Sequence, residues 1–322
     1  MFNFSLETKK ETKIDDQITY DFIALGVGPA GLNAALYATR KGLKTLLVGS
    51  EIGGQLKNTS DVDNYLGLGL IDAEDMIEKF LDHATKLEVP MLTGVYIKKI
   101  NKQDDLFYIT LDNGQILKSI TVLYALGGSP RKLNVEGEKE FSSKGVSYCV
   151  TCDAPFFKQK HVVVAGGGNS AIDAALDLTR TASKVTIIHR SQFRADQKSI
   201  DKLLAMPNVE VFLETQILSM HGDTNLKYLK VLDKKTNQVR NFETDGIFIE
   251  IGSIPNTQLI DGMISLNTGK EIIVNQNQQT NVAGFYAAGD VTENPHKQII
   301  IAAAEGAKAA LEAAIYINKR GE

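Results

Sequence analysis

The feature that most constrains the fold of this chain is a strand, glycine turn, helix and strand pattern that occurs twice. In the first copy, residues 20–25 predict a buried strand, residues 32–40 a helix, and residues 45–48 a second strand. The second copy starts with a strand at residues 162–165 and continues with a glycine turn, a helix and another strand. Such units predict two α/β domains, each with a parallel sheet and crossover helices.

The first turn, Gly26-Val27-Gly28-Pro29-Ala30-Gly31, has the glycine spacing of a dinucleotide-binding loop. Gly26 permits a tight turn, Gly28 lets the backbone approach a pyrophosphate, and Gly31 lets the helix pack closely on the strand. Glu51 stands where such a domain places the acid that binds a ribose hydroxyl, about 20 residues further on. The alternative is a plain glycine-rich turn. The candidate ligands here are Gly26, Gly28, Pro29, Ala30, Gly31 and Glu51.

The second turn, Gly166-Gly167-Gly168-Asn169-Ser170-Ala171, precedes a strand with a basic end. That strand ends in His189-Arg190, and Arg194 follows four residues later with no acid between them. A carboxylate here is typical of an NAD site, whereas arginines suit the 2′-phosphate of NADPH. The sequence therefore favours NADPH, and a solvated basic loop is the alternative. The candidate ligands are Gly167, Gly168, Asn169, Ser170, His189, Arg190 and Arg194.

Three other segments complete the pattern. Residues 106–111 and 115–118 flank Asp112-Asn113-Gly114, which predicts a β-hairpin. A short strand before Asp290 places a carboxylate where it can bind a polyol hydroxyl. Residues 298–318 predict a final helix whose alanine-rich, apolar sequence suits close packing beside a cofactor.

Length and composition exclude several classes of protein. The 322 residues exceed the usual size of a single core, which favours two domains. A net charge of -4 without a long block of like charge argues against nucleic acid. No uncharged apolar run approaches the ~20 residues of a membrane span, and the polar first twenty residues lack a secretion signal. With only two cysteines, a reducing cytoplasm is the expected location.

Both cysteines lie in one short segment, Cys149-Val150-Thr151-Cys152-Asp153. Two cysteines separated by two residues occur in redox centres and in zinc sites. Zinc needs further ligands, but the chain has no third cysteine and its five histidines show no ligand spacing, so no metal is expected. Two interpretations of the segment remain, a redox pair and an inert pair of buried thiols.

In their order along nearly the whole chain, these motifs resemble those of low-molecular-weight thioredoxin reductases, class II pyridine nucleotide-disulfide oxidoreductases. The resemblance also includes Gly53-Gly54-Gln55-Leu56, Asp63-Asn64-Tyr65 and Ala287-Ala288-Gly289-Asp290. It implies an α/β fold of two Rossmann-like, three-layer ββα domains and a homodimer. Residues 1–130 and 254–322 would form a discontinuous FAD domain, with an NADPH domain of residues 131–253 inserted into it.

The resemblance implies a thioredoxin-disulfide reductase that serves cell redox homeostasis. Electrons would pass from NADPH through FAD and a Cys149–Cys152 disulfide to thioredoxin or a similar small dithiol protein. Cys152 would be the flavin-proximal sulfur, Cys149 would attack the partner's disulfide, and Asp153 would be a general acid/base with a raised pKa. The FAD ligands that it adds are Gly54, Gln55, Leu56, Asn64, Gly127, Gly289, Asp290, Lys297, Gln298 and Ile299.

The chain departs from that family pattern in three places. Ser191 stands where the family has a second arginine, which leaves NADH open as the donor. Leu126 replaces the threonine of an Ala-Thr-Gly motif. Residues 297–301 and 305–308 are more similar to the flavoprotein component of alkyl hydroperoxide reductase, a relative that usually favours NADH. The N-terminal thioredoxin-like extension of that relative is expected to be missing here.

These departures keep other functions in view. One is an NADH-dependent reductase for a peroxiredoxin or a glutaredoxin-like partner. A ferredoxin-dependent reductase is disfavoured by the intact turn at residues 166–171. The alternative outside enzymology is a nucleotide-binding redox sensor, which the cysteine pair with Asp153 disfavours.

Overall fold

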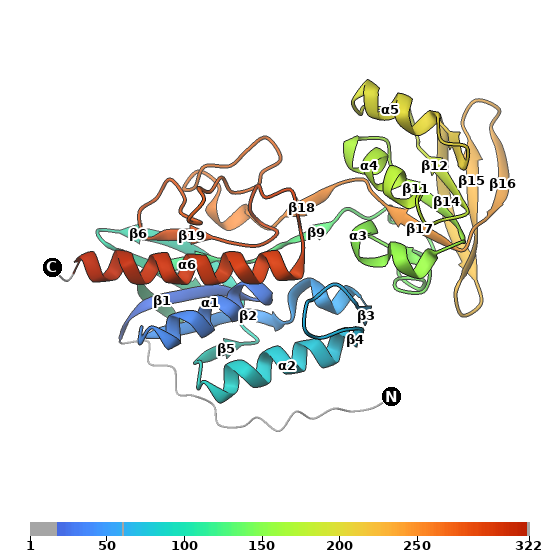
Figure 1. The fold of residues 1–322 in the computed structure, drawn as a ribbon. Helices are drawn as coiled ribbons and strands as arrows, with labels where there is room; N and C mark the ends of the chain where they lie inside the picture. Colours follow the sequence, from blue (N-terminus) through green and yellow to red (C-terminus); the bar gives the residue numbers. More distant parts are fainter. Residues whose placement is uncertain (1–17, 60, 321–322) are drawn as a thin grey trace. The chain divides into compact units, whose positions relative to one another are not determined.

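The computed structural model describes residues 18–59 and 61–320, which form two compact units (Figure 1). The first unit comprises the described residues up to Lys57, Ala73–Gly128, and the described residues from Pro255 onward. The second unit comprises Asn58–Asp72 and Ser129–Ile254, so it includes residues 58–72, which were predicted to belong to the first domain. Most of the N-terminal segment considered for a secretion signal, residues 1–17, lies outside the described residues.

The first unit is built on a sheet with the strand order β5-β2-β1-β8-β7-β6, in which β19 also pairs with β8. Its parallel strands are β1 (Thr19–Val27), β2 (Thr45–Ile52), β5 (Met91–Thr93), β8 (Ile116–Tyr124) and β19 (Phe285–Ala287). β6 (Ile97–Gln103) and β7 (Leu106–Leu111) are antiparallel, and the hairpin predicted between β7 and β8 is confirmed. β7 pairs with the first half of β8 and β19 with its second half.

Successive apolar side chains of β1 point to opposite faces of this sheet, and helices cover one of these faces. Phe22 and Ala24 point into a core shared with α1 (Pro29–Arg40) and α6 (Ile299–Arg320), whereas Ile23 and Leu25 point into a core on the other face. α2 (Ala73–Lys86) packs beside α1. Among the described residues, no helix combines the length and apolar character that crossing a membrane requires.

The second unit has a parallel sheet with the strand order β10-β17-β11-β12-β13. These strands are β10 (Val146–Ser147), β11 (His161–Ala165), β12 (Lys184–Ile188), β13 (Val209–Phe212) and β17 (Gly246–Ile249). On one side lie α3 (Val150–Asp153), α4 (Asn169–Leu178) and α5 (Gln197–Leu204). On the other lies an antiparallel sheet of β14 (Thr215–Gly222), β15 (Leu226–Asp233) and β16 (Gln238–Glu243).

Alternation along β11 produces these layers. Val162 and Val164 join the core under the helices, while Val163 and Ala165 join the core against the antiparallel sheet. The predicted fold class, α/β with two Rossmann-like domains, is confirmed. The remaining elements are short: η1 (Gly54–Asn58), β3 (Asp61–Val62), β4 (Ile71–Asp72), β9 (Gly128–Pro130), η2 (Ala154–Phe157), β18 (Ser253–Pro255) and η3 (Gln258–Ile260).

Candidate active site

A disulfide joins Cys149 to Cys152 at the start of α3, with 5.3 Å between their Cα atoms. Cys149 is the N-cap residue of this short helix, and its Sγ accepts a hydrogen bond from the amide of Cys152 at 3.2 Å. Because the two sulfurs are bonded to each other, neither is the thiolate that zinc binds. In the part of the chain that the structure describes, no three side chains of His, Cys, Asp or Glu gather as metal ligands.

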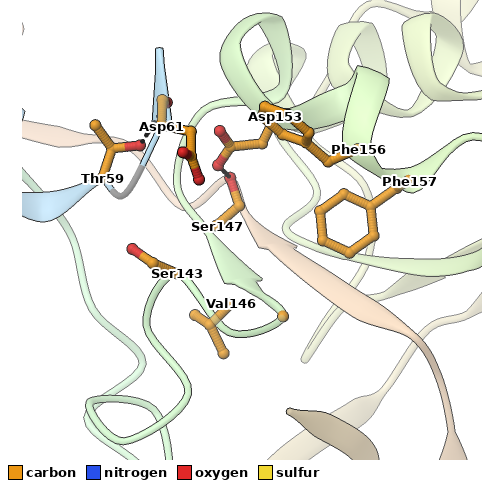
Figure 2. A pocket seen from close by; sticks show the side chains of 9 residues that line it. Thr59, Asp61, Ser143, Val146, Ser147, Asp153, Phe156 and Phe157 are labelled. Carbon is orange, nitrogen blue, oxygen red and sulfur yellow. Dashed lines mark hydrogen bonds between the residues drawn. The ribbon is translucent and has the colours of Figure 1, made fainter. Parts of the chain in front are cut away.

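Asp153 follows Cys152 directly, and a serine holds its carboxyl group. The hydroxyl of Ser147 donates to Oδ2 of Asp153 at 2.6 Å (Figure 2). The same hydroxyl accepts from the amide of Cys149 at 3.1 Å. Burial raises the pKa of Asp153; the hydrogen bond from Ser147 opposes this shift, and the charge of Asp61 adds to it. The raised pKa expected for a general acid is therefore present.

The carboxyl group of Asp153 faces a cavity of about 200 Å³ in the second unit (Figure 2). Polar groups and two aromatic rings share its wall, and Phe156 is 42% exposed. The lining residues are Thr59, Asp61, Ser143, Gly145, Val146, Ser147, Asp153, Phe156 and Phe157. Ser147 and Asp61 were missed in the sequence, where an isolated serine and an aspartate in a polar loop carry no signal.

A buried glutamate fixes the chain just before the cysteines. Glu138, 3% exposed, accepts hydrogen bonds from the amides of Leu133 and Asn134 and from the hydroxyl of Tyr148 at 2.9 Å. Buried carboxylates are tolerated when several donors satisfy them. Glu138 therefore ties Tyr148, and with it the neighbouring Cys149, to the loop before β10.

A second carboxyl group lies at the other end of this segment. Glu250 follows β17, its amide donates to the carbonyl of Ala165 at 2.9 Å, and its side chain accepts from the amide of Val150. Burial raises the pKa of Glu250 from 4.5 to about 7, although the hydrogen bond from Val150 opposes the shift. The site thus contains a glutamate that ionises near neutral pH and contacts α3.

This glutamate predicts a pH-dependent stability. The contribution of Glu250 to the free energy of unfolding is fully present below pH 4.5 and is lost as pH rises through about 7, because ionisation of its carboxyl group is disfavoured in the folded state. Glu250→Gln cannot ionise. We expect its free energy of unfolding, relative to wild type, to rise by on the order of 3 kcal/mol between pH 5 and pH 9. Denaturant unfolding at both pH values measures this, with the exposed Glu243→Gln as control. Parallel pH curves for wild type and Glu250→Gln would contradict it.

In the first unit, the glycine turn has the steric features that its sequence predicted. Gly26 has φ +112°, and a Cβ there would lie 2.2 Å from the carbonyl oxygen of Ala125. A Cβ on Gly31 would lie 1.8 Å from the oxygen of Gly26, so only glycine allows this close packing. A Cβ on Gly28 would meet nothing closer than Gly54 at 3.9 Å, so its outer side is open for a ligand.

Three of the other predicted FAD residues come together from distant elements. Gln55 in η1 donates to the carboxylate of Asp290, which follows β19. Burial raises the pKa of Asp290, and the positive charge of Lys297 opposes that shift. Pro29 and Ala30 begin α1, and Gly289 adjoins Asp290. The unit that exposes backbone at Gly28 thus also holds an amide paired with a partly buried carboxylate.

The remaining predicted FAD residues have varied environments. Glu51 is exposed and pairs with Lys57 at 3.1 Å, and Leu56 is buried in the core. Gly127 has φ +62° with no atom within 4 Å of its Cβ position. Gln298 and Ile299 lie at the start of α6, and Asn64 belongs to the second unit. FAD binding by these residues remains a prediction.

One buried polar residue beside Asp290 was not among the predicted ligands. Glu305 in α6 is 6% exposed and accepts hydrogen bonds from the amide of Gly289 at 2.7 Å and from the side chain of Asn294. It therefore orients the backbone next to Asp290. A glutamate among the alanines of a buried helix face was the available signal.

The second glycine turn collects the basic residues that follow β12. A Cβ on Gly167 would lie 2.4 Å from Cδ2 of His189, and the amide of Arg194 donates to the carbonyl of Gly167 at 2.8 Å. Gly168 has open space around it and is the N-cap of α4, whose first turn contains Asn169 and Ser170. The Oδ1 of Asn169 accepts from the amide of Asp196 at 2.8 Å. The structure thus brings the predicted nucleotide residues of this unit to one edge of its parallel sheet.

Two Rossmann-like domains, one of them carrying a Cys-x-x-Cys disulfide, define a disulfide oxidoreductase. Residues 20–306 match the Pyridine nucleotide-disulphide oxidoreductase family, and the chain belongs to this family. The chain thus has the fold of this family.

Named relatives agree with this assignment. The F subunit of alkyl hydroperoxide reductase from Staphylococcus aureus (strain NCTC 8325 / PS 47) is 36% identical over 311 residues, which are 96% of this chain and 61% of the relative. The chain thus spans less than two thirds of the length of this relative. A crystal structure of thioredoxin reductase from Streptococcus pyogenes has a TM-score of 0.90 at 32% identity, covering 94% of this chain and 99% of that one. Thioredoxin reductase from Giardia duodenalis has a TM-score of 0.89 at 29% identity, covering 94% of this chain and 100% of that one.

Proposed function

We propose that this chain is a thioredoxin-disulfide reductase that takes electrons from NADPH and uses FAD and the Cys149–Cys152 disulfide to reduce a thioredoxin-like protein. The observation that carries the proposal is the cysteine pair beside a carboxyl group with a raised pKa, in the unit that also contains the second glycine turn. The likeness to two thioredoxin reductases over nearly their full length supports the same reaction.

The first unit fits FAD. Its turn exposes backbone at Gly28, while Gln55 and Asp290 offer an amide and a carboxylate to polyol hydroxyls. Lys297 brings a positive charge, which its ion pair with Glu271 at 3.0 Å holds in place. When bound, FAD supplies the two-electron relay between the nicotinamide and the disulfide. Gly28 and the start of α1 would hold its pyrophosphate.

The cysteines then perform thiol–disulfide exchange. Two electrons and two protons convert the Cys149–Cys152 bond into two thiols, and Asp153 gives a proton to a sulfur that leaves as a thiolate. The Cys149 thiol then gives its proton to the Asp153 carboxylate and attacks the partner's disulfide as a thiolate, which forms a mixed disulfide and releases one partner thiolate that takes up this proton. Cys152 attacks Cys149 next, which re-forms the original bond and releases the partner as a dithiol.

Two alternatives have specific support. The relationship to the alkyl hydroperoxide reductase of Staphylococcus aureus, together with residues 297–301 and 305–308, favours an NADH-dependent reductase for a peroxiredoxin or a glutaredoxin-like partner. A nucleotide-binding redox sensor is the alternative without catalysis. We also propose that the protein is cytoplasmic. We propose in addition that it is a homodimer, which sedimentation of the flavin-loaded protein tests.

A single set of assays separates these functions. We expect the FAD-loaded protein to oxidise NADPH rapidly when oxidised thioredoxin from the same cells is present, and more slowly with NADH. A peroxiredoxin with peroxide is the parallel acceptor. Fast turnover only with NADH and the peroxiredoxin system would establish the first alternative. Flavin reduction without turnover on any of these acceptors would favour the sensor.

A further inference from the structure

A group of cations surrounds the loop that follows β12. Arg190 and Arg194 belong to this loop and are exposed, whereas His189 between them and the sheet is buried. The loop is folded against the glycine turn through the contact of His189 with Gly167. In a Rossmann-like domain, the end of this strand is where the adenosine ribose of the nucleotide lies.

Ser191 does not contribute a charge to this loop. Its hydroxyl is 3.1 Å from Nε2 of His189, so its side chain serves the interior of the loop. The position at which the resemblance leads us to expect a second arginine is therefore neutral. On the loop's own sequence, the positive charge available for a 2′-phosphate is reduced to Arg190 and Arg194.

Lys234 reaches the same loop from the antiparallel sheet. It follows β15, and its Nζ donates to the carbonyl of Arg190 at 3.2 Å. Its amide donates to the carbonyl of Glu214 at 2.9 Å, while the carboxylate of Asp233 accepts from the next amide, that of Lys235, at 2.8 Å. The backbone around Lys234 is thus fixed on both sides, and its ammonium group lies beside Arg190.

The cations of this cluster are free of salt bridges in the described part of the chain. Among the described residues, Arg190, Arg194 and Lys234 form no ion pair with a carboxylate. The nearby carboxylate of Glu214 accepts instead from Gln192 at 2.9 Å. The local field is felt by His189: burial and then the charge of Arg194 lower its pKa, with Arg190 and Lys234 acting in the same direction and the backbone of Gln192 opposing them.

We propose that Lys234 supplies the cation that Ser191 lacks and, with Arg190 and Arg194, binds the 2′-phosphate of NADPH. This inference rests on the proposed function, because it assumes that the second glycine turn holds a pyridine nucleotide. Three cations that have no ion-pair partner among the described residues suit a dianionic phosphate and give no advantage to the uncharged 2′-hydroxyl of NADH. Lys234 is therefore a residue that sets the preference for NADPH over NADH from outside the loop that follows β12.

Binding of nucleotide fragments tests this without any turnover. The FAD-loaded protein is titrated with 2′,5′-ADP and with 5′-AMP in a calorimeter, as wild type, Lys234→Met and Lys235→Met. We expect Lys234→Met to weaken 2′,5′-ADP about 10-fold, the effect of losing one partly exposed phosphate contact, and to leave 5′-AMP unchanged. Lys235 is the matched control, since it is the adjacent lysine and is expected to leave both affinities unchanged.

The companion measurements distinguish the failure of the inference from that of the proposed function. Lys234→Arg keeps the charge and is expected to retain tight 2′,5′-ADP binding. In steady state, the ratio of kcat/KM for NADPH to that for NADH should fall about 10-fold in Lys234→Met. Equal affinities of all variants for 2′,5′-ADP would overturn the role of Lys234 while leaving the nucleotide site intact. Absence of binding of either fragment to wild type would overturn the nucleotide site as well.

Discussion

Cys152→Ser should abolish reduction of thioredoxin-type disulfides while leaving the protein able to accept electrons from a nicotinamide. The reason is that turnover needs both sulfurs of the Cys149–Cys152 bond, whereas the two glycine turns do not depend on it. We expect NADPH to bleach the bound flavin anaerobically in this variant, with no steady-state oxidation of NADPH when oxidised thioredoxin is added.

The same variant predicts a covalent product. Its remaining thiol, Cys149, is expected to attack the partner's disulfide once and to stay attached, since no second thiol is present to resolve the mixed disulfide. Intact mass measurement under non-reducing conditions detects this adduct. Cys149→Ser is the matched control and should form far less of it. If Cys149→Ser traps the partner and Cys152→Ser does not, the assigned roles of the two sulfurs are reversed.

Asp153→Asn should lower the rate of disulfide reduction by about 10²-fold or more, the usual contribution of a positioned proton donor. The amide can still accept the hydrogen bond from Ser147, so the local fold is retained. The step that slows should be the opening of the Cys149–Cys152 bond. Stopped-flow measurement of flavin reoxidation isolates that step, and an unchanged rate there would remove Asp153 from the proton transfer.

Substitutions of two neighbours of Asp153 are expected to shift its pKa in opposite directions. A proton donor loses activity as pH rises above its pKa. Ser147→Ala removes a hydrogen bond that lowers the pKa of Asp153, so the fall in rate should move to higher pH. Asp61→Asn removes a negative charge that raises this pKa, so the fall should move to lower pH. Shifts in the same direction for both variants would assign the pH dependence to another group.

Local signals in the sequence were sufficient for the main elements of the fold. Glycines at Gly26 and Gly31 mark a turn and a contact that no Cβ can enter, so their spacing predicts the turn and the helix after it. Alternating apolar residues predict β1 and β11 for a similar reason, since every second side chain meets the same core. The predicted ends of the elements were less accurate. The helix predicted from residue 32 starts at Pro29, and the strand predicted to end at residue 118 continues to Tyr124 because β1 and β19 pair with its second half.

The cysteine pair and Asp153 are adjacent in the sequence, so no long-range contact was needed to find them, while their roles in a candidate centre came from the resemblance to thioredoxin reductases. The predicted assignment of residues 58–72 to the first domain differs from the structure, in which Asn58–Asp72 joins the second unit. Composition and spacing carry no information about which of the two units a short segment contacts.

Contacts between distant residues came from the folded chain alone. Gln55 meets Asp290 across 235 positions, and Lys234 meets Arg190 across 44. Asp61 adds its charge to Asp153 from a separate segment. The physical reason is that helices and strands report interactions within a few residues, whereas the side chains that tune a pKa or bind a phosphate are brought together by sheet order and layer packing. The glycine turns and the cysteine pair are thus local properties of this chain, while their electrostatic surroundings are properties of its tertiary structure.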